Sequence, residues 1–139
     1  MDNSMRCTLS IILNKDKSKV LMSFHTKQQM YNFVGGHIEE GEDELAASYR
    51  EVFEETGISS NDIVLNFLGE EHTFISYSNF EFYLYITTGV VESDIELKPE
   101  KNPLFWADIN DLDKLLYNSF GEGNCYVYLK RALELLKNI

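Results

Sequence analysis

The chain has 139 residues, of which 44% are hydrophobic and 25% charged, the composition of one ordinary globular domain. Its formal net charge of −11 argues against broad binding to nucleic-acid polymers or anionic membranes. Small phosphorylated ligands stay compatible with this charge, since metal ions can reverse its local sign. We find no apolar run of the roughly 18 residues that span a bilayer and no secretion signal. We therefore expect one domain, residues 1–139, in the cytoplasm, with Cys7 and Cys125 reduced and buried.

Alternating side chains predict strands in the first part of the chain. Residues 6–13 place Leu9 and Ile11 on one face and Ser10 and Ile12 on the other. After a polar turn, residues 19–25 form a second strand, so the two segments predict a hairpin. Residues 31–34 predict a short strand that runs into a double glycine, 35–36, where we expect a turn or a ligand close to the backbone.

A helix is predicted over residues 43–56, with Asp43 as its N-cap and Gly57 just beyond its end. We expect its apolar stripe to face the core, on the side opposite Glu51 and Glu54; the stripe consists of Leu45, Ala46, Tyr49, Val52 and Phe53. With Glu55, the two glutamates occupy positions i, i+3 and i+4, so like charges crowd together. A divalent cation would explain this arrangement, whereas a generic acidic helix face is usually only solvated.

The second half of the chain predicts further strands, followed by helices. Residues 62–74 are β-rich, and the GEEH sequence at 69–72 indicates a bulge or bend. Residues 80–88 alternate, and an acidic, turn-rich segment follows at 89–102. Further elements are expected as a strand at 104–107, a short helix at 110–117 and an amphipathic helix at 125–137. This order predicts an α+β fold with helices packed on a mixed sheet.

The stretch from residue 36 to residue 58 carries a recognisable motif. It resembles the Nudix hydrolase signature G-x5-E-x7-R-E-U-x-E-E-x-G-U, in which U is a bulky aliphatic residue. The matching residues are Gly36, Glu42, Arg50, Glu51, Val52, Glu54, Glu55, Gly57 and Ile58. The surrounding strand order is similar to that of MutT-like members, so the resemblance implies the Nudix fold, an α/β/α sandwich with a mixed sheet flanked by helices.

The resemblance implies Mg²⁺-dependent hydrolysis, for which Mn²⁺ can substitute. Glu51, Glu54 and Glu55 become metal ligands together with the main-chain carbonyl of Gly35, and Arg50 orients the neighbouring carboxylates, although it could equally be a simple surface partner of Glu54. Hard cations prefer such oxygen ligands, and they activate water for attack on phosphorus. The implied substrate is a small-molecule nucleoside diphosphate derivative. A nucleoside triphosphate, an oxidised one included, is favoured, giving nucleoside monophosphate and pyrophosphate.

One further carboxylate is expected outside the motif. Many family members take an additional glutamate from a loop after the central strands, as metal ligand or general base. We choose Glu100, which lies shortly before the strand at 104–107, and keep Glu96 and Glu92 as alternatives.

Three residues are candidates for substrate binding. His37 follows the double glycine, where it could approach substrate phosphates, although a structural or simply exposed histidine is the more usual explanation. Lys27 is a candidate phosphate contact without support from the motif. Tyr83 could stack on a base, but packing under a helix explains its position equally well.

Two properties stay open at this stage. A non-catalytic nucleotide-binding or sensing module on the same fold is the alternative function, although every motif glutamate and Arg50 are present. The chain could be a monomer or a homodimer, because the apolar helix at 125–137 suits either a core or an interface.

Overall fold

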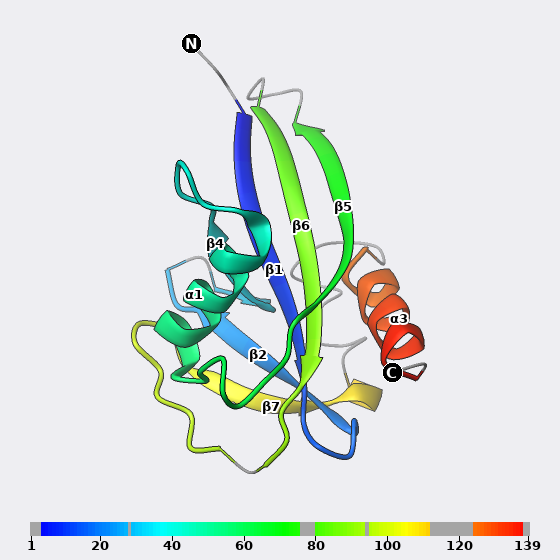
Figure 1. Ribbon diagram of the computed structural model, residues 1–139. Helices are drawn as coiled ribbons and strands as arrows, with labels where there is room; N and C mark the ends of the chain where they lie inside the picture. The colour runs from blue at the N-terminus through cyan, green and yellow to red at the C-terminus, as the bar shows by residue number, and fades with distance from the viewer. Residues whose placement is uncertain (1–3, 28, 76–79, 94, 112–123, 138–139) are drawn as a thin grey trace.

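The computed structural model describes residues 4–27, 29–75, 80–93, 95–111 and 124–137 (Figure 1). Seven strands form a single sheet. They are β1 (Ser4–Leu13), β2 (Lys19–His25), β3 (Met30–Asn32), β4 (Val34–His37), β5 (Asn66–Ile75), β6 (Phe80–Val90) and β7 (Leu104–Asp108). The helical elements are α1 (Glu44–Thr56), a 3-10 turn (Ile109–Asp111) and α3 (Asn124–Lys137). No helix in these ranges is long and apolar enough to cross a membrane.

The sheet mixes parallel and antiparallel pairing. Its main order is β3-β2-β1-β6-β5, with β4 added to β1 and β7 added to β2. Strands β1 and β6 are parallel along their whole length, while the other pairs are antiparallel. The predicted hairpin is confirmed, since Leu13 of β1 lies opposite Val20 of β2. The mixed sheet also confirms the expected α+β class.

Helices α1 and α3 lie on opposite sides of the β1–β6 pair (Figure 1). One hydrophobic cluster joins Leu9 and Ile11 of β1 to Leu129 of α3. A second cluster joins Ile12 of β1 to Val52 of α1. Strand β1 is therefore buried on both faces, as its two sets of alternating residues require. This arrangement confirms the sandwich of helix, sheet and helix.

The ends of α1 are confirmed, but its buried face differs from the prediction. The Asp43 carboxylate caps the helix by accepting from the Ala46 N–H at 2.7 Å, and Gly57 has φ of 80° beyond the last turn. The side chains of Leu45 and Phe53 are 42% and 56% exposed, so their assignment to the core is wrong.

The buried residues of α1 are instead Ala47, Ser48, Val52 and Thr56. At 100° per residue, the buried positions 47, 48, 52 and 56 span one arc of the helix, and position 55 falls inside this arc, between positions 47 and 48. The predicted separation of an apolar side from a carboxylate side is therefore wrong, because Glu55 lies between the helix and the sheet. Small side chains suit this face because α1 packs on the glycine-containing strand β4.

The double glycine lies within a strand, so of the two predicted alternatives the turn is wrong, while both glycines line a cavity in which a ligand could approach them. Gly35 and Gly36 belong to β4 and lie opposite Leu9 and Thr8 of β1. A Cβ at Gly35 would come within 2.1 Å of the Thr8 carbonyl oxygen. The glycine is therefore needed for close approach between two backbones rather than for a turn.

The remaining elements mostly agree with the sequence. The predicted irregularity near GEEH is confirmed as a register shift between Phe67 and Gly69, although β5 continues through the four residues. The C-terminal helix is confirmed as α3. Of the helix predicted over 110–117, only the 3-10 turn that ends at Asp111 is described, and the rest lies outside the described residues.

Candidate active site

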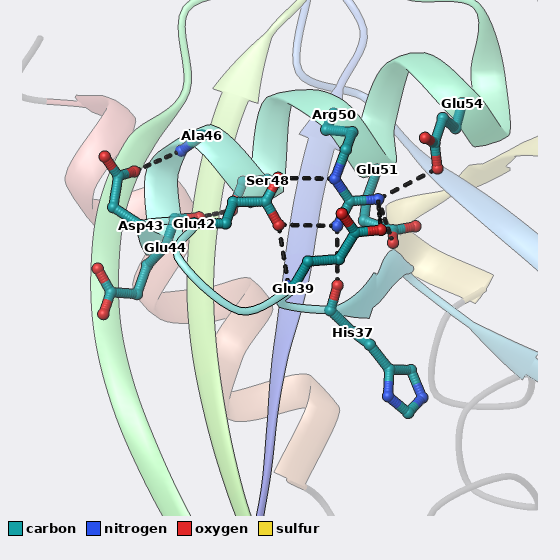
Figure 2. Close-up of polar contacts among 10 residues, drawn as sticks. All are labelled: His37, Glu39, Glu42, Asp43, Glu44, Ala46, Ser48, Arg50, Glu51 and Glu54. Carbon is teal, nitrogen blue, oxygen red and sulfur yellow. Dashed lines mark hydrogen bonds and ion pairs between the residues drawn. The ribbon is translucent and has the colours of Figure 1, made fainter.

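Arg50 of α1 connects the motif carboxylates (Figure 2). Its Nε and Nη2 donate to the two carboxylate oxygens of Glu42 at 2.7 and 2.9 Å. Its Nη1 donates to Glu51 Oε1 at 3.0 Å and to Glu54 Oε2 at 3.2 Å. Nη2 also donates to the main-chain carbonyl of His37 at 2.9 Å. The arginine thus joins the end of β4, the loop after it and two glutamates of the helix.

The pair of Arg50 and Glu42 is the strongest of these contacts. Hydrogen bonds from Arg50, followed by the Glu39 backbone N–H, lower the pKa of Glu42 from 4.5 to about 2. The same partner raises the pKa of Arg50 further above its ordinary value. Because the arginine stays charged, it partly offsets the repulsion among the nearby carboxylates.

Glu55 lies in a different environment from the glutamates bound to Arg50. Burial, and then repulsion from Glu51, raises the pKa of Glu55 to about 7, while a hydrogen bond from the Gly35 backbone opposes this rise. Burial also raises the pKa of Glu51, with the Arg50 hydrogen bond acting against it. The described part of the chain gives Glu55 no ion pair with a cationic side chain. A bound cation would stabilise its charged form.

A cavity of about 190 Å³ brings the glutamates of α1 together with Glu100. Its lining residues are Ser23, Glu51, Glu54, Glu55, Glu100, Lys101, Asn102 and Leu104. Glu92 and Glu96, the alternatives to Glu100, do not line it.

The segment before β7 is anchored to the end of α1. The Lys98 N–H donates to the Thr56 carbonyl at 2.8 Å. The Lys98 side chain also packs over Gly57, where an added Cβ would lie 3.1 Å from the lysine Cβ. These contacts bring Glu100, two residues further on, to the carboxylate cavity.

A larger cavity of about 790 Å³ adjoins the same carboxylates. It shares Glu51 and Glu55 with the smaller cavity, together with Lys101 and Asn102. Its other lining residues are Cys7, Thr8, Leu9, His25, Asn32, Phe33, Gly35, Gly36, His37, Glu39 and Leu84. The mixture of apolar and hydrogen-bonding side chains, and a volume in the range of ligand pockets, suit an organic ligand of nucleoside size.

Three buried polar atoms have no hydrogen-bond partner within the described ranges: Thr8 Oγ1, Ser23 Oγ and Asn32 Oδ1. Thr8 and Asn32 line the larger cavity, and Ser23 lines the smaller one. Buried polar groups are normally paired. Their position at the two cavities leaves these atoms available to bind a ligand or an ordered water molecule. The sequence carried no signal for these residues, since isolated Ser, Thr and Asn residues occur in many strands.

The three predicted substrate-binding residues are separated by the fold. His37 lines the larger cavity, although its ring points away from Arg50 (Figure 2). Tyr83 stacks on His72, with ring centroids 4.4 Å apart, and does not line either cavity. Lys27 is exposed and likewise lies outside both linings. Lys101, which sequence reasoning missed, lines both cavities, and its only signal was its position next to Glu100.

The donor set fits a hard divalent cation. Glu51, Glu54, Glu55 and Glu100 offer only carboxylate oxygens, the ligands that Mg²⁺ and Mn²⁺ prefer. No three His, Cys, Asp or Glu side chains in the described residues already form a cage for a metal ion. Arg50 binds Glu51 and Glu54 in this conformation. Each of these bonds uses one carboxylate oxygen, Glu51 Oε1 and Glu54 Oε2, so the second oxygen of each glutamate is left for a cation.

Comparison with known proteins identifies the family. The sequence profile of the NUDIX domain matches residues 5–126. The chain belongs to the Nudix hydrolase family. The resemblance that the motif indicated is thereby confirmed, as is the expectation of a hydrolase. The matched range extends far beyond residues 36–58, so the Nudix domain includes the strands and cavities described above.

Individual relatives of this Nudix chain are distant. An RNA pyrophosphohydrolase from Ruthia magnifica subsp. Calyptogena magnifica is 38% identical over 58 residues, which cover 42% of this chain and 32% of that protein. A C. elegans Ap4A hydrolase in a binary complex superimposes with a TM-score of 0.78 and 16% identity, over 97% of this chain and 99% of that one. A NUDIX family hydrolase from Clostridium perfringens superimposes with a TM-score of 0.75 and 22% sequence identity, over 98% of this chain and 99% of that one. The two structures confirm the Nudix fold.

Proposed function

We propose that this Nudix protein hydrolyses a nucleoside diphosphate linked to another group, with Mg²⁺ as cofactor and Mn²⁺ as a substitute. The favoured substrate is a nucleoside triphosphate, oxidised forms included, and its products are nucleoside monophosphate and pyrophosphate. The observation that carries the proposal is the meeting of Glu51, Glu54, Glu55 and Glu100 in one cavity. That cavity shares lining residues with a second one large enough for a nucleoside.

The proposal assigns different roles to the site residues. Glu51, Glu54 and Glu55, with the Gly35 carbonyl, hold the cation. When bound, the cation would offset the charge of the diphosphate and make a water molecule more acidic. Arg50 orients Glu51 and Glu54, and Glu100 is a metal ligand or accepts a proton from the attacking water.

The larger cavity supports a nucleoside as the organic part of the substrate. Leu9, Phe33 and Leu84 provide apolar surface, while Thr8 and Asn32 provide unpaired hydrogen-bonding atoms. His37 lines the same cavity and is the proposed contact for substrate phosphates among the three candidates. Substrate binding by Lys27 and Tyr83 stays a prediction, because neither residue lines either cavity.

The names of two similar proteins support hydrolysis but suggest different substrates. One is an RNA pyrophosphohydrolase and the other an Ap4A hydrolase. The net charge of −11 favours a small molecule over a nucleic-acid polymer. The same reasoning, together with the reduced cysteines expected from the sequence, leads us to propose a cytoplasmic location.

The test is a substrate panel with identification of the products. Nucleoside triphosphates, oxidised guanine nucleotides, Ap4A and a 5′-triphosphorylated RNA would be incubated with and without Mg²⁺. We expect Mg²⁺-dependent formation of nucleoside monophosphate and pyrophosphate, fastest with a small triphosphate. In ¹⁸O-labelled water, the label would identify the phosphorus attacked. Absence of turnover, or equal turnover by Glu54→Gln, would contradict the proposal.

A non-catalytic nucleotide-binding module is the second candidate. It predicts that nucleotides bind in the presence of Mg²⁺ without being consumed. Isothermal titration calorimetry, followed by chromatography of the same sample, would separate this outcome from catalysis. The complete set of motif carboxylates favours the catalytic reading.

A further inference from the structure

The hydroxyl of Ser23 is an unpaired polar group beside the carboxylate cavity. Ser23 lies on β2 and is 2% exposed, and its Oγ has no hydrogen-bond partner among the described residues. The residue lines the cavity of about 190 Å³ together with Glu55 and Glu100. A serine that served only the fold would normally have its hydroxyl paired when buried this deeply.

Several other buried hydroxyls of the sheet and of α1 are paired, whereas Thr8 Oγ1, which is also unpaired among the described residues, likewise lines a cavity. Ser10 Oγ lies 2.8 Å from Thr87 Oγ1. Ser48 Oγ donates to the Glu44 carbonyl at 2.9 Å, and Thr88 Oγ1 donates to the Ile11 carbonyl at 2.8 Å. Ser23 thus differs from Ser10 and Ser48 both in lacking a partner and in lining the cavity.

The chemistry of the cavity indicates what Ser23 contacts. Ionised glutamates only accept hydrogen bonds, and the side chains that can donate are Ser23, Lys101 and Asn102. The glutamates of α1 form one wall, whereas the donors come from β2 and from the segment before β7. A phosphoryl group is small enough for this cavity and needs donors for the oxygens that do not face a cation.

The backbone of Ser23 is held firmly while its hydroxyl can turn. The residue is paired with Asn32 of β3 on one side and with Leu104 of β7 on the other. Rotation about the Cα–Cβ bond moves Oγ among three staggered positions without moving the strand. A fixed backbone and a turning hydroxyl suit a group that forms its hydrogen bond only when substrate arrives.

We infer that the Ser23 hydroxyl donates a hydrogen bond to a non-bridging phosphoryl oxygen of the substrate's diphosphate, and so positions the phosphate against the glutamates of α1. This inference rests on the proposed function, since it assigns a further residue to the same site. No covalent step involves Ser23.

The first experiment compares Ser23→Ala with Ser10→Ala. Loss of a hydrogen bond to a charged group should lower kcat/KM of Ser23→Ala by about 10- to 100-fold. Its melting temperature should stay the same or rise, because the hydroxyl removed has no partner in the free protein. Ser10→Ala removes a paired hydroxyl away from both cavities, so it should melt at a lower temperature with kcat/KM unchanged.

The second experiment measures binding without turnover. The probe is an α,β-methylene nucleoside triphosphate with Mg²⁺, titrated calorimetrically into wild type and Ser23→Ala. We expect about 10- to 100-fold weaker binding to the variant. The corresponding nucleoside, which carries no phosphate, should bind both proteins equally, and a preference for wild type would assign Ser23 to the nucleoside instead.

The outcomes separate this inference from the proposed function. If wild type turns over nucleotides and Ser23→Ala matches it in kcat/KM and binding, the Ser23 assignment alone is wrong. If the analogue binds wild type more tightly than the variant but no nucleotide is consumed, the assignment holds and the hydrolase proposal fails. A parallel loss of stability and activity in Ser23→Ala, or no binding of the analogue to wild type, would overturn the inference.

Discussion

Arg50 and Glu42, eight residues apart, form a two-point ion pair in which Nε and Nη2 of the arginine donate to the two carboxylate oxygens at 2.7 and 2.9 Å. The contacts of Arg50 with Glu51 and Glu54 are longer, at 3.0 and 3.2 Å. Glu42 therefore orients the arginine, and the arginine orients the glutamates of the helix. Glu42 thus acts on Glu51 and Glu54 through Arg50.

Substitution of Glu42 should weaken the fold in a pH-dependent way. Its pKa is about 2 in the folded protein and 4.5 ordinarily, so its stabilising effect is present above pH 4.5 and is lost as the pH falls towards 2. We expect Glu42→Gln to melt below wild type at pH 7 and to approach it at pH 3. Circular dichroism across this range provides the measurement.

The matched control for this prediction is Glu39→Gln. Glu39 approaches the same arginine only to 3.8 Å, and its side chain is 71% exposed. Its substitution should leave the melting temperature nearly unchanged at every pH. A Glu42→Gln deficit that stayed constant from pH 7 to pH 3 would contradict the linkage argument.

Metal-free protein should lose stability as the pH rises from 4.5 to the Glu55 pKa of about 7. This pKa is raised to about 7, so the folded state keeps a proton that the unfolded chain releases near 4.5. The stability associated with this proton is present below 4.5 and is lost as the pH rises through 7. In EDTA at pH 8, Glu55→Gln should be more stable than wild type by roughly 2 to 3 kcal/mol. Urea unfolding at pH 8 and at pH 4.5 should show this difference shrinking at the lower pH.

Two comparisons sharpen the Glu55 prediction. Glu54→Gln changes a side chain that is 50% exposed, and it should show no such gain at pH 8. Addition of Mg²⁺ should raise the stability of wild type more than that of Glu55→Gln, because a ligand that binds the folded state stabilises it. Equal stability of wild type and Glu55→Gln at pH 8 in EDTA would show that burial does not penalise this carboxylate.

Glu100 should matter for turnover and Glu96 should not. Loss of a general base usually lowers kcat by about 10²- to 10⁴-fold, so we expect a fall of at least 10²-fold in Glu100→Gln. Glu96→Gln is the matched control, because both residues are exposed in the same segment and only Glu100 lines the carboxylate cavity. Steady-state kinetics decides. Unchanged turnover in Glu100→Gln with loss of turnover in Glu96→Gln would reverse the assignment.

The two glycines of β4 should give opposite results when changed to alanine. At Gly35, the added Cβ would lie 2.1 Å from a backbone oxygen of β1, so strands β1 and β4 must separate. We expect Gly35→Ala to lower the free energy of unfolding by roughly 3 kcal/mol. At Gly36, the three atoms nearest to the added Cβ all belong to the Glu51 carboxylate, at 2.4 Å and beyond, and this side chain can turn away.

Gly36→Ala should therefore affect activity more than stability. We expect a loss of less than about 1 kcal/mol in unfolding free energy and a fall of at least about 10-fold in kcat/KM, because Glu51 is displaced. Urea unfolding and steady-state kinetics on both variants test the contrast. If Gly36→Ala were the less stable of the two, the assignment of close contacts would be wrong.

The buried face of α1 can be tested with two neighbouring residues. Val52 is fully buried, so Val52→Ala should lower the free energy of unfolding by about 2 kcal/mol. Phe53 is 56% exposed, so Phe53→Ala should cost less than about 1 kcal/mol despite its larger side chain. Urea unfolding measures both. A larger loss of unfolding free energy in Phe53→Ala than in Val52→Ala would support the buried face that was predicted from hydrophobicity alone.

Local patterns predicted the elements better than their contacts. The Asp43 cap, the left-handed Gly57 and the two faces of β1 follow from residues close together in the chain, and the structure confirms each. The double glycine was expected to form a turn or to let a ligand approach the backbone, because glycine serves both purposes. Its true requirement, a contact with Thr8, depends on a strand almost thirty residues away.

The same distinction applies to the site. Position within the chain made Glu100 a candidate but did not separate it from Glu96 and Glu92. The choice depends on the hydrogen bond between the Lys98 N–H and the Thr56 carbonyl, which attaches that segment to the end of α1. Leu45 and Phe53 were assigned to the core by hydrophobicity, yet both are exposed. Helix α1 instead packs on the glycine-containing strand β4 with the face that carries its small side chains.

Residue order alone identifies the Nudix motif, the helix that bears it and the carboxylate chemistry, because one turn of helix brings Glu51, Glu54 and Glu55 together. Contacts across the fold place Glu55 between helix and sheet and bring Glu100 beside it. Next to both lies the Ser23 hydroxyl, which has no hydrogen-bond partner in the described part of the chain. These properties arise when strands and loops distant in the chain pack together, and spacing along the chain does not encode which of them meet.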